Sequence, residues 1–169
     1  MTDNSRLIQE QMQYAGMLMK SGQFEAALVK HNKVLELDPR NEMALTGKGY
    51  SLVQVALKNG LGPQFNSRLS EAVLCYDKAI QISPNHGYLW AFKGTALVYL
   101  TKFNEANECY DNALRLEPGD PETTFNKANC LYVMGRLQEA LKYYEMAHSL
   151  GHSSAIEKIN EVKQELRRQ

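Results

Sequence analysis

The sequence of 169 residues has no long apolar run, no excess of charge of either sign, and only three cysteines. A membrane span needs about 18 consecutive apolar residues, and no window reaches that length. The first residues, MTDNSRLIQEQMQYAG, contain no apolar run of signal-peptide length. The three cysteines form no CxxC pair and are odd in number, as is typical of a reducing compartment. We therefore expect a cytoplasmic protein that does not contact membranes.

The charge pattern argues against a nucleic-acid-binding protein. Nineteen basic residues balance 19 acidic ones, and the two signs are interspersed without a basic stripe. Nucleic-acid binders normally carry such a stripe, because neutralising phosphates supplies most of their non-specific affinity. The sequence therefore predicts no nucleic-acid partner.

Motifs of catalysis and of cofactor binding are also missing. The sequence has no GxSxG, no phosphate-binding loop and no HExxH. His148 and His152 are four residues apart, but Gly151 intervenes and no carboxylate or thiol completes a metal site. We expect a non-enzyme that has no cofactor and no metal.

What the sequence does contain is an internal repeat. Aligned on Pro39, Pro84 and Pro118, three segments read EAALVKHNKVLELDP, EAVLCYDKAIQISP and EANECYDNALRLEP, and a fourth reads EALKYYEMAHSLGH. Outside the second copy the period is 34 residues. We assign one domain over residues 1–169, with repeats at 8–41, 42–86, 87–120 and 121–154 and a capping helix at 155–169. The second repeat has 45 residues, 11 more than the others (45 − 34).

The repeated positions share physical character as well as letters. Small residues recur at positions 8 and 20 of each repeat, which allows two helices to approach closely: Ala15, Gly49, Gly94 and Ala128, then Ala27, Ala72, Ala106 and Ala140. Large apolar residues recur at helical spacing around them. Asn41, Asp120 and Ser154 lie at repeat boundaries and suit helix N-caps, with Ser154 and Glu157 forming a capping box. Each repeat is therefore predicted to be a pair of amphipathic helices.

This pattern resembles the tetratricopeptide repeat family, whose repeats are helix-turn-helix units of 34 residues. The third repeat matches best, with these residues in register: Trp90, Gly94, Phe103, Ala106, Tyr110, Ala113 and Pro118. Lysine at position 7 of three repeats (Lys48, Lys93 and Lys127) is similar to prokaryotic arrays. The resemblance implies an all-α, right-handed superhelical solenoid of four repeats and a C-terminal capping helix.

In that family, set positions of the first helices line a concave groove that binds other proteins. The resemblance therefore implies a binding groove whose residues here are largely uncharged and often aromatic: Met12, Met19, Tyr50, Val53, Tyr88, Tyr99, Phe125, Asn126, Asn129 and Tyr132. Amphipathic aromatic side chains suit a partner helix or an extended peptide, and Asn126 and Asn129 could hydrogen-bond a peptide backbone. The alternative is that several of these side chains only complete the packing of neighbouring helices.

The carboxylate clamp with which some family members grip chaperone tails needs lysine and asparagine at positions 5 and 9 of one repeat. The first two repeats have Met12 and Gly16, then Thr46 and Tyr50, at those positions. We therefore expect no chaperone-tail binding by that mechanism. Two other functions stay open: a self-associating scaffold that forms homo-oligomers and, with less support from this uncharged groove, a helical-repeat RNA binder.

The 11 additional residues lie in the segment KNGLGPQFNSRLSEA of the second repeat. The helical pattern continues past its normal end up to the breakers in NGLGP, and resumes with apolar residues from Phe65 onward. The insertion is therefore predicted to lengthen both helices, with Leu61 and Phe65 near the tip. These two side chains either pack on one another or form an apolar lip that contacts a partner or a second copy.

Overall fold

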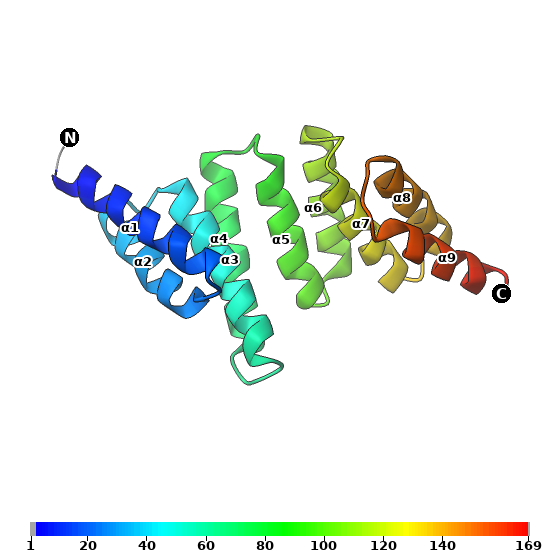
Figure 1. The fold of residues 1–169 in the computed structure, drawn as a ribbon, viewed down its shortest axis with the longest axis horizontal. Coiled ribbons are helices and arrows are strands. Elements are labelled where there is room, and N and C mark those ends of the chain that lie inside the picture. Colours follow the sequence, from blue (N-terminus) through cyan, green and yellow to red (C-terminus); the bar gives the residue numbers. More distant parts are fainter. Residues whose placement is uncertain (1–2, 169) are drawn as a thin grey trace. The chain divides into compact units, whose positions relative to one another are not determined.

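The computed structural model describes residues 3–168, and all the regular secondary structure in that range is α-helix. The helices are α1 (Asp3–Lys20), α2 (Phe24–Leu37), α3 (Glu42–Asn59), α4 (Phe65–Ile82), α5 (Gly87–Tyr99), α6 (Phe103–Leu116), α7 (Pro121–Val133), α8 (Leu137–Ser149) and α9 (Ala155–Leu166). They group into two compact units, Met1–Asn85 and His86–Gln169. Figure 1 shows the helices of each unit folding back on one another as antiparallel pairs. The predicted all-α fold of paired helices is confirmed.

The first unit contains the pairs α1/α2 and α3/α4, with α3 also packed against α2. The small residues of the repeat lie at these crossings, because Ala15, Ala27 and Ala72 are fully buried. Gly49 is pressed against the ring of Tyr76, and a Cβ built on Gly49 would lie 2.8 Å from Tyr76 Cε1. Close approach of the two helices therefore depends on the absence of a side chain at this glycine.

The α3/α4 pair is longer than the other pairs, as the insertion predicts. Both α3 and α4 have 18 residues, whereas α5 has 13 and α6 has 14. At about 1.5 Å per residue, the additional four or five residues lengthen each helix by roughly 7 Å. The turn between them projects from the first unit in Figure 1.

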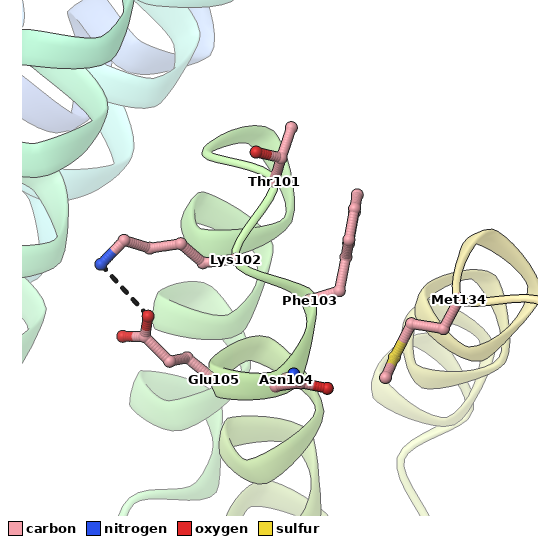
Figure 2. Close-up of a pocket in the computed structure, with 6 residues that line it drawn as sticks. All are labelled: Thr101, Lys102, Phe103, Asn104, Glu105 and Met134. Atoms are coloured by element: carbon pink, nitrogen blue, oxygen red, sulfur yellow. Dashed lines mark ion pairs between the residues drawn. The ribbon is translucent and has the colours of Figure 1, made fainter.

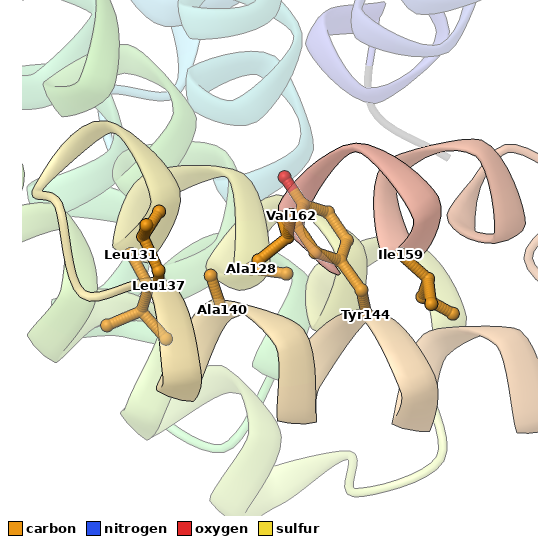
Figure 3. Packing of buried hydrophobic residues seen from close by; sticks show 7 residues of the cluster. All are labelled: Ala128, Leu131, Leu137, Ala140, Tyr144, Ile159 and Val162. Atoms are coloured by element: carbon orange, nitrogen blue, oxygen red, sulfur yellow. The ribbon is translucent and has the colours of Figure 1, made fainter. Parts of the chain in front are cut away.

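The second unit contains the pairs α5/α6 and α7/α8, followed by α9 packed on α8. Its core joins α7, α8 and α9 through Ala128, Leu131, Leu137, Ala140, Tyr144, Ile159 and Val162 (Figure 3). Ile159 and Val162 of α9 are 5% and 0% exposed. The predicted C-terminal helix therefore closes the apolar core of the last pair.

The predicted helix caps are confirmed at two boundaries and wrong at a third. Asn41 Oδ1 accepts a hydrogen bond from the amide of Ala44 at 3.0 Å, and Asp120 Oδ2 accepts one from Thr123 at 2.8 Å. Ser154 makes no side-chain cap bond, and its backbone is already helical (φ −77°, ψ −7°). An N-cap side chain reaches the first turn from extended backbone, so Ser154 cannot form the predicted capping box.

Among residues 3–168, no helix combines the length and the apolar character that crossing a membrane requires.

Candidate functional site

The predicted groove residues of the first unit lie on the first helices α1 and α3. Met12, Met19 and Tyr50 are half-buried, and Tyr50 makes an edge contact with the ring of Phe24 at 6.0 Å. Val53 is only 5% exposed, so it packs inside the unit and offers little surface to a ligand. The predicted groove residues of the first unit therefore expose less apolar surface than the sequence suggests.

Met19 also contacts the interior, because its Sδ lies 3.4 Å from Nε2 of His31. His31 is 2% exposed and occupies the position that holds a buried tyrosine in the other repeats. Burial without a charged partner disfavours the imidazolium and lowers the pKa of His31 to about 4. His31 is therefore a neutral core residue at pH 7.

In the second unit, two tyrosines of α5 are exposed. Tyr88 is 36% exposed and Tyr99 is 40% exposed. The Tyr88 ring stacks on His86 with centroids 5.4 Å apart and makes an edge contact with Phe92 at 6.0 Å. These neighbours restrict the rotamers of Tyr88, so the ring presents a pre-organised apolar face with a hydroxyl at its end.

Phe125 of α7 lies between two rings and is half-buried. It stacks on His152 with centroids 3.9 Å apart and an interplanar angle of 12°, and its centroid is 5.5 Å from that of Tyr144. His152 Nε2 lies 3.3 Å from a carboxylate oxygen of Glu122. Asn126, one residue after Phe125, is half-buried. Phe125 therefore contributes an edge of the surface while it fixes the turn that precedes α9.

Asn129 of α7 is oriented by the core. Its Oδ1 accepts a hydrogen bond of 2.6 Å from the hydroxyl of Tyr144, which is fully buried. The same relationship links Thr95 and Tyr110 in the preceding pair, where Oγ1 and the hydroxyl are 3.2 Å apart. Because the carbonyl of Asn129 is occupied, the two N–H groups of its amide are left to donate to a ligand.

Tyr132 is held by the C-terminal helix. The single proton of its hydroxyl is shared between two carboxylates of α9, Glu165 at 3.0 Å and Glu161 at 3.1 Å. These hydrogen bonds to carboxylates raise the pKa of Tyr132 to about 12. Lys158 of α9 lies 5.9 Å from the centre of the ring. Tyr132 therefore docks α9 on α7, a role that its position in the repeat did not indicate.

At the tip of the α3/α4 pair, Leu61 is 90% exposed and Phe65 is half-buried. A side chain that is 90% exposed makes few contacts, so Leu61 does not pack on Phe65. Mutual packing was the first of the two alternatives that the sequence left open. Phe65 lines a shallow hollow of about 340 Å³ together with Asn59, Gly60, Gly62, Pro63, Gln64 and Arg68. Leu61 thus projects into solvent from a glycine-rich turn.

A second shallow hollow, of about 380 Å³, lies in the second unit and was not anticipated. Figure 2 shows its lining by Thr101, Lys102, Phe103, Asn104, Glu105 and Met134, with an ion pair of 3.1 Å between Lys102 and Glu105. Thr101 has φ +59°, whereas Gly22 and Gly135 occupy the equivalent turn position in other repeats. A β-branched residue is rare at positive φ, so this turn is strained.

Sequence reasoning also missed the role of the lysines at position 7. Lys127 is 4% exposed, and its ammonium donates to Asp111 of α6 and, at 2.9 Å, to the hydroxyl of Tyr143 on α8. Burial alone would lower the pKa of Lys127, but these two hydrogen bonds outweigh it and raise the pKa. Lys48 similarly pairs with Glu71 at 2.8 Å. A lysine at this position therefore ties adjacent helices together.

In the described part of the chain, no group of three or more His, Cys, Asp or Glu side chains is placed to hold a metal. His152 is engaged with Phe125 and Glu122 as described, and the thiols of Cys75, Cys109 and Cys130 are all buried.

The sequence profile of the tetratricopeptide repeat family matches residues 93–151. This match places residues 93–151 in the tetratricopeptide repeat family. TTC0263, a tetratricopeptide repeat protein of Thermus thermophilus, superposes with a TM-score of 0.79 at 20% identity, covering 91% of this chain and 80% of that one. No curated protein matches the sequence. These likenesses establish an all-α helical-repeat solenoid as the fold class.

The descriptions of two further structures of this fold mention peptide binding. YrrB, with an unusual peptide-binding site, gives a TM-score of 0.71 at 24% identity and covers 98% of this chain and 84% of that one. The second such domain of human RPAP3, in complex with an HSP70 peptide, gives 0.66 at 19% identity and covers 75% of this chain and 97% of that one. Tetratricopeptide repeat folds thus serve as protein-interaction modules in proteins of similar structure.

Proposed function

We propose that this protein is a non-catalytic adaptor that binds a peptide or helix of another protein on the first helices of its repeats. The observation that carries the proposal is the exposed pair Tyr88 and Tyr99 on α5, which are 36% and 40% exposed. Tyrosine is enriched at binding hot spots because it buries a large area, loses little conformational entropy and retains a hydroxyl for hydrogen bonding.

The neighbouring α7 supplies polar recognition in the same unit. The amide of Asn129, fixed by Tyr144, presents N–H donors that suit the backbone carbonyls of an extended peptide. Asn126 and Phe125 lie on the same helix and are half-buried, which leaves part of each accessible. We therefore assign the principal contact to Tyr88, Tyr99, Phe125, Asn126 and Asn129, and a smaller one to Met12, Met19 and Tyr50 in the first unit.

Tyr132 and Val53 belong to the proposed surface only in a supporting role. Tyr132 is engaged by α9, and Val53 is buried, so neither offers its full side chain to a ligand. Leu61 and Phe65 remain a candidate second contact, which favours a scaffold able to hold a second protein or another copy at the hairpin tip. Cytoplasmic location and the absence of nucleic-acid and membrane partners stay predictions from the sequence.

The test is a selection from a displayed peptide library on the immobilised protein, followed by fluorescence anisotropy with the peptides recovered. Tyr99→Ala and Asn129→Ala should each weaken binding about tenfold, a typical loss for a hot-spot residue. Ile156→Ala on α9 is the matched control, because Ile156 is also an exposed apolar residue of the second unit, at 47%. Affinity that is equal in all three variants would refute the assigned surface.

A peptide ending in the chaperone-tail sequence of the RPAP3 complex provides a second arm. The clamp residues are missing from this chain, so that peptide should show no saturable binding at concentrations that saturate the selected peptides. Binding that depends on its terminal carboxylate would show that a different set of side chains performs the same recognition. A protein that selects no peptide at all would instead favour the self-associating scaffold.

A further inference from the structure

The N-terminal helix α1 displays an apolar face that its counterparts in other repeats keep buried. Position 10 of the repeat holds Met17 in α1 and smaller residues elsewhere: Ser51, Ala96 and Cys130. Met17 is 61% exposed, whereas the other three are each 0% exposed. Tyr14, one turn earlier on α1, is 49% exposed. We call the surface formed by Tyr14 and Met17 the α1 face.

In α3 and α7 the equivalent surface packs against the second helix of the preceding pair, α2 and α6 respectively. Cys130 Sγ of α7 donates to the backbone oxygen of Phe103 on α6 at 3.4 Å. Lys127, which is equivalent to Tyr14, bonds Asp111 on α6. In the first unit, α3 packs against α2 in the same way. Among the described residues, no helix packs on the α1 face in the way that α2 packs on α3 and α6 packs on α7.

Helix α9 of the second unit has a different outer face. Helix α9 turns Ile159 and Val162 inward, and its outward positions are mostly polar: Glu157, Asn160, Lys163 and Gln164. The α1 face carries a methionine and a tyrosine instead, and large exposed apolar side chains side by side are typical of an interaction site.

We propose that the α1 face is an interface between two copies of this chain, packed antiparallel about a two-fold axis. Charge complementarity selects this occupant: besides Lys30 Nζ, which lies 5.5 Å from the centre of the Tyr14 ring, the two charges that flank the α1 face are opposite in sign. Glu10 lies one turn before Tyr14 and Lys20 about one turn after Met17, both exposed, and neither forms an ion pair within residues 3–168. Antiparallel pairing about the α1 face places Glu10 of one copy beside Lys20 of the other, whereas parallel pairing would bring like charges together.

The contact is small, so the dimer is weak. Two apolar side chains per copy fall well short of the roughly 800 Å² that each partner contributes to a standard interface. We expect a dissociation constant on the order of 10 µM or weaker. This dimerisation is independent of peptide binding, because the α1 face shares no residue with the surface proposed above for the peptide.

Sedimentation equilibrium of the full chain, from about 5 to 500 µM, tests the proposal. The wild type should pass from monomer to dimer in this range, and Met17→Ser should weaken association at least tenfold. Leu74→Ser is the matched control, since Leu74 is 60% exposed on α4 of the same unit, and it should change the constant by less than twofold. A wild type that stays monomeric, or a dimer weakened equally by Leu74→Ser, overturns the proposal.

A charge exchange tests the antiparallel orientation. Glu10→Lys alone should weaken the dimer several-fold, because it opposes two lysines, and adding Lys20→Glu should restore it. Failure of the double variant to restore association overturns the antiparallel arrangement. The groove variant Tyr99→Ala should dimerise as the wild type does, which separates this interface from the proposed peptide site.

Discussion

The hydroxyl of Tyr144 donates a hydrogen bond of 2.6 Å to Oδ1 of Asn129, and so links the core of the last helix pair to a half-buried amide on α7. The ring of Tyr144 is fully buried in the apolar cluster that also contains Ala128 and Val162 (Figure 3). Burial raises the pKa of Tyr144, so the hydroxyl remains a donor at any pH at which the protein is studied. A core residue thereby sets the orientation of a surface amide.

Replacing Tyr144 with phenylalanine should cost about 1 kcal/mol of unfolding free energy, because it removes one buried hydrogen bond and leaves the ring in place. The side-chain amide signals of Asn129 in an NMR spectrum should also move towards random-coil positions. Tyr110→Phe is the control for stability, since its hydroxyl pairs with Thr95 instead and leaves Asn129 untouched. Unchanged Asn129 signals in Tyr144→Phe would contradict the orienting role.

Adding a methyl group at two glycines of the first unit should have opposite effects. A Cβ on Gly49 would lie 2.8 Å from Cε1 of Tyr76, which is 1% exposed and has no room to move. Gly49→Ala should therefore destabilise the protein by about 1 to 3 kcal/mol. Gly16 has nothing within 4 Å of its Cβ position and lies inside α1, so Gly16→Ala should stabilise by up to about 1 kcal/mol. Urea unfolding measures both changes, and equal signs would refute this packing.

The buried His31 should make the protein lose stability in mildly acidic solution. Its pKa is about 4 in the folded state and near its ordinary 6.5 in the unfolded chain, so the unfolded state binds the proton more readily. The stabilisation is complete above pH 6.5 and is lost as the pH falls towards 4. The full difference corresponds to at most about 3 kcal/mol.

The variant His31→Phe isolates this contribution, because carboxylates elsewhere also affect stability in acid. The unfolding free energy of the wild type should fall more steeply than that of His31→Phe between pH 6.5 and 4. The two proteins should show parallel profiles between pH 7 and 8, where the imidazole is neutral in both states. Parallel profiles over the whole range would mean that His31 is hydrated or charged in the fold.

The sequence predicted the features that depend on local chemistry and on the 34-residue period. Paired helices, the caps at Asn41 and Asp120, and the lengthening of α3 and α4 follow from apolar spacing and from breakers such as Gly60. These features need no knowledge of which helix packs on which. The resemblance to the tetratricopeptide repeat family adds the expected neighbours.

The sequence could not predict interactions that join residues far apart in the chain. Tyr132 forms a hydrogen bond with Glu165, which is 33 residues away, and Lys127 of α7 forms one with Asp111 of α6. The repeat assigns Tyr132 to an open surface, because it cannot show where α9 comes to lie. Burial of Val53 likewise depends on the packing of a whole unit, so the fold was better predicted than the accessible part of the candidate site.

The two boundary residues Asp120 and Ser154 look equivalent in the sequence but should differ when each is changed to alanine. Asp120→Ala removes the acceptor of the Thr123 amide, and such caps contribute about 1 kcal/mol. Ser154→Ala should change the unfolding free energy by less than about 0.5 kcal/mol, because its hydroxyl caps nothing. Thermal unfolding followed by circular dichroism compares the two. A similar loss in both variants would mean that Ser154 adopts the extended cap geometry in solution.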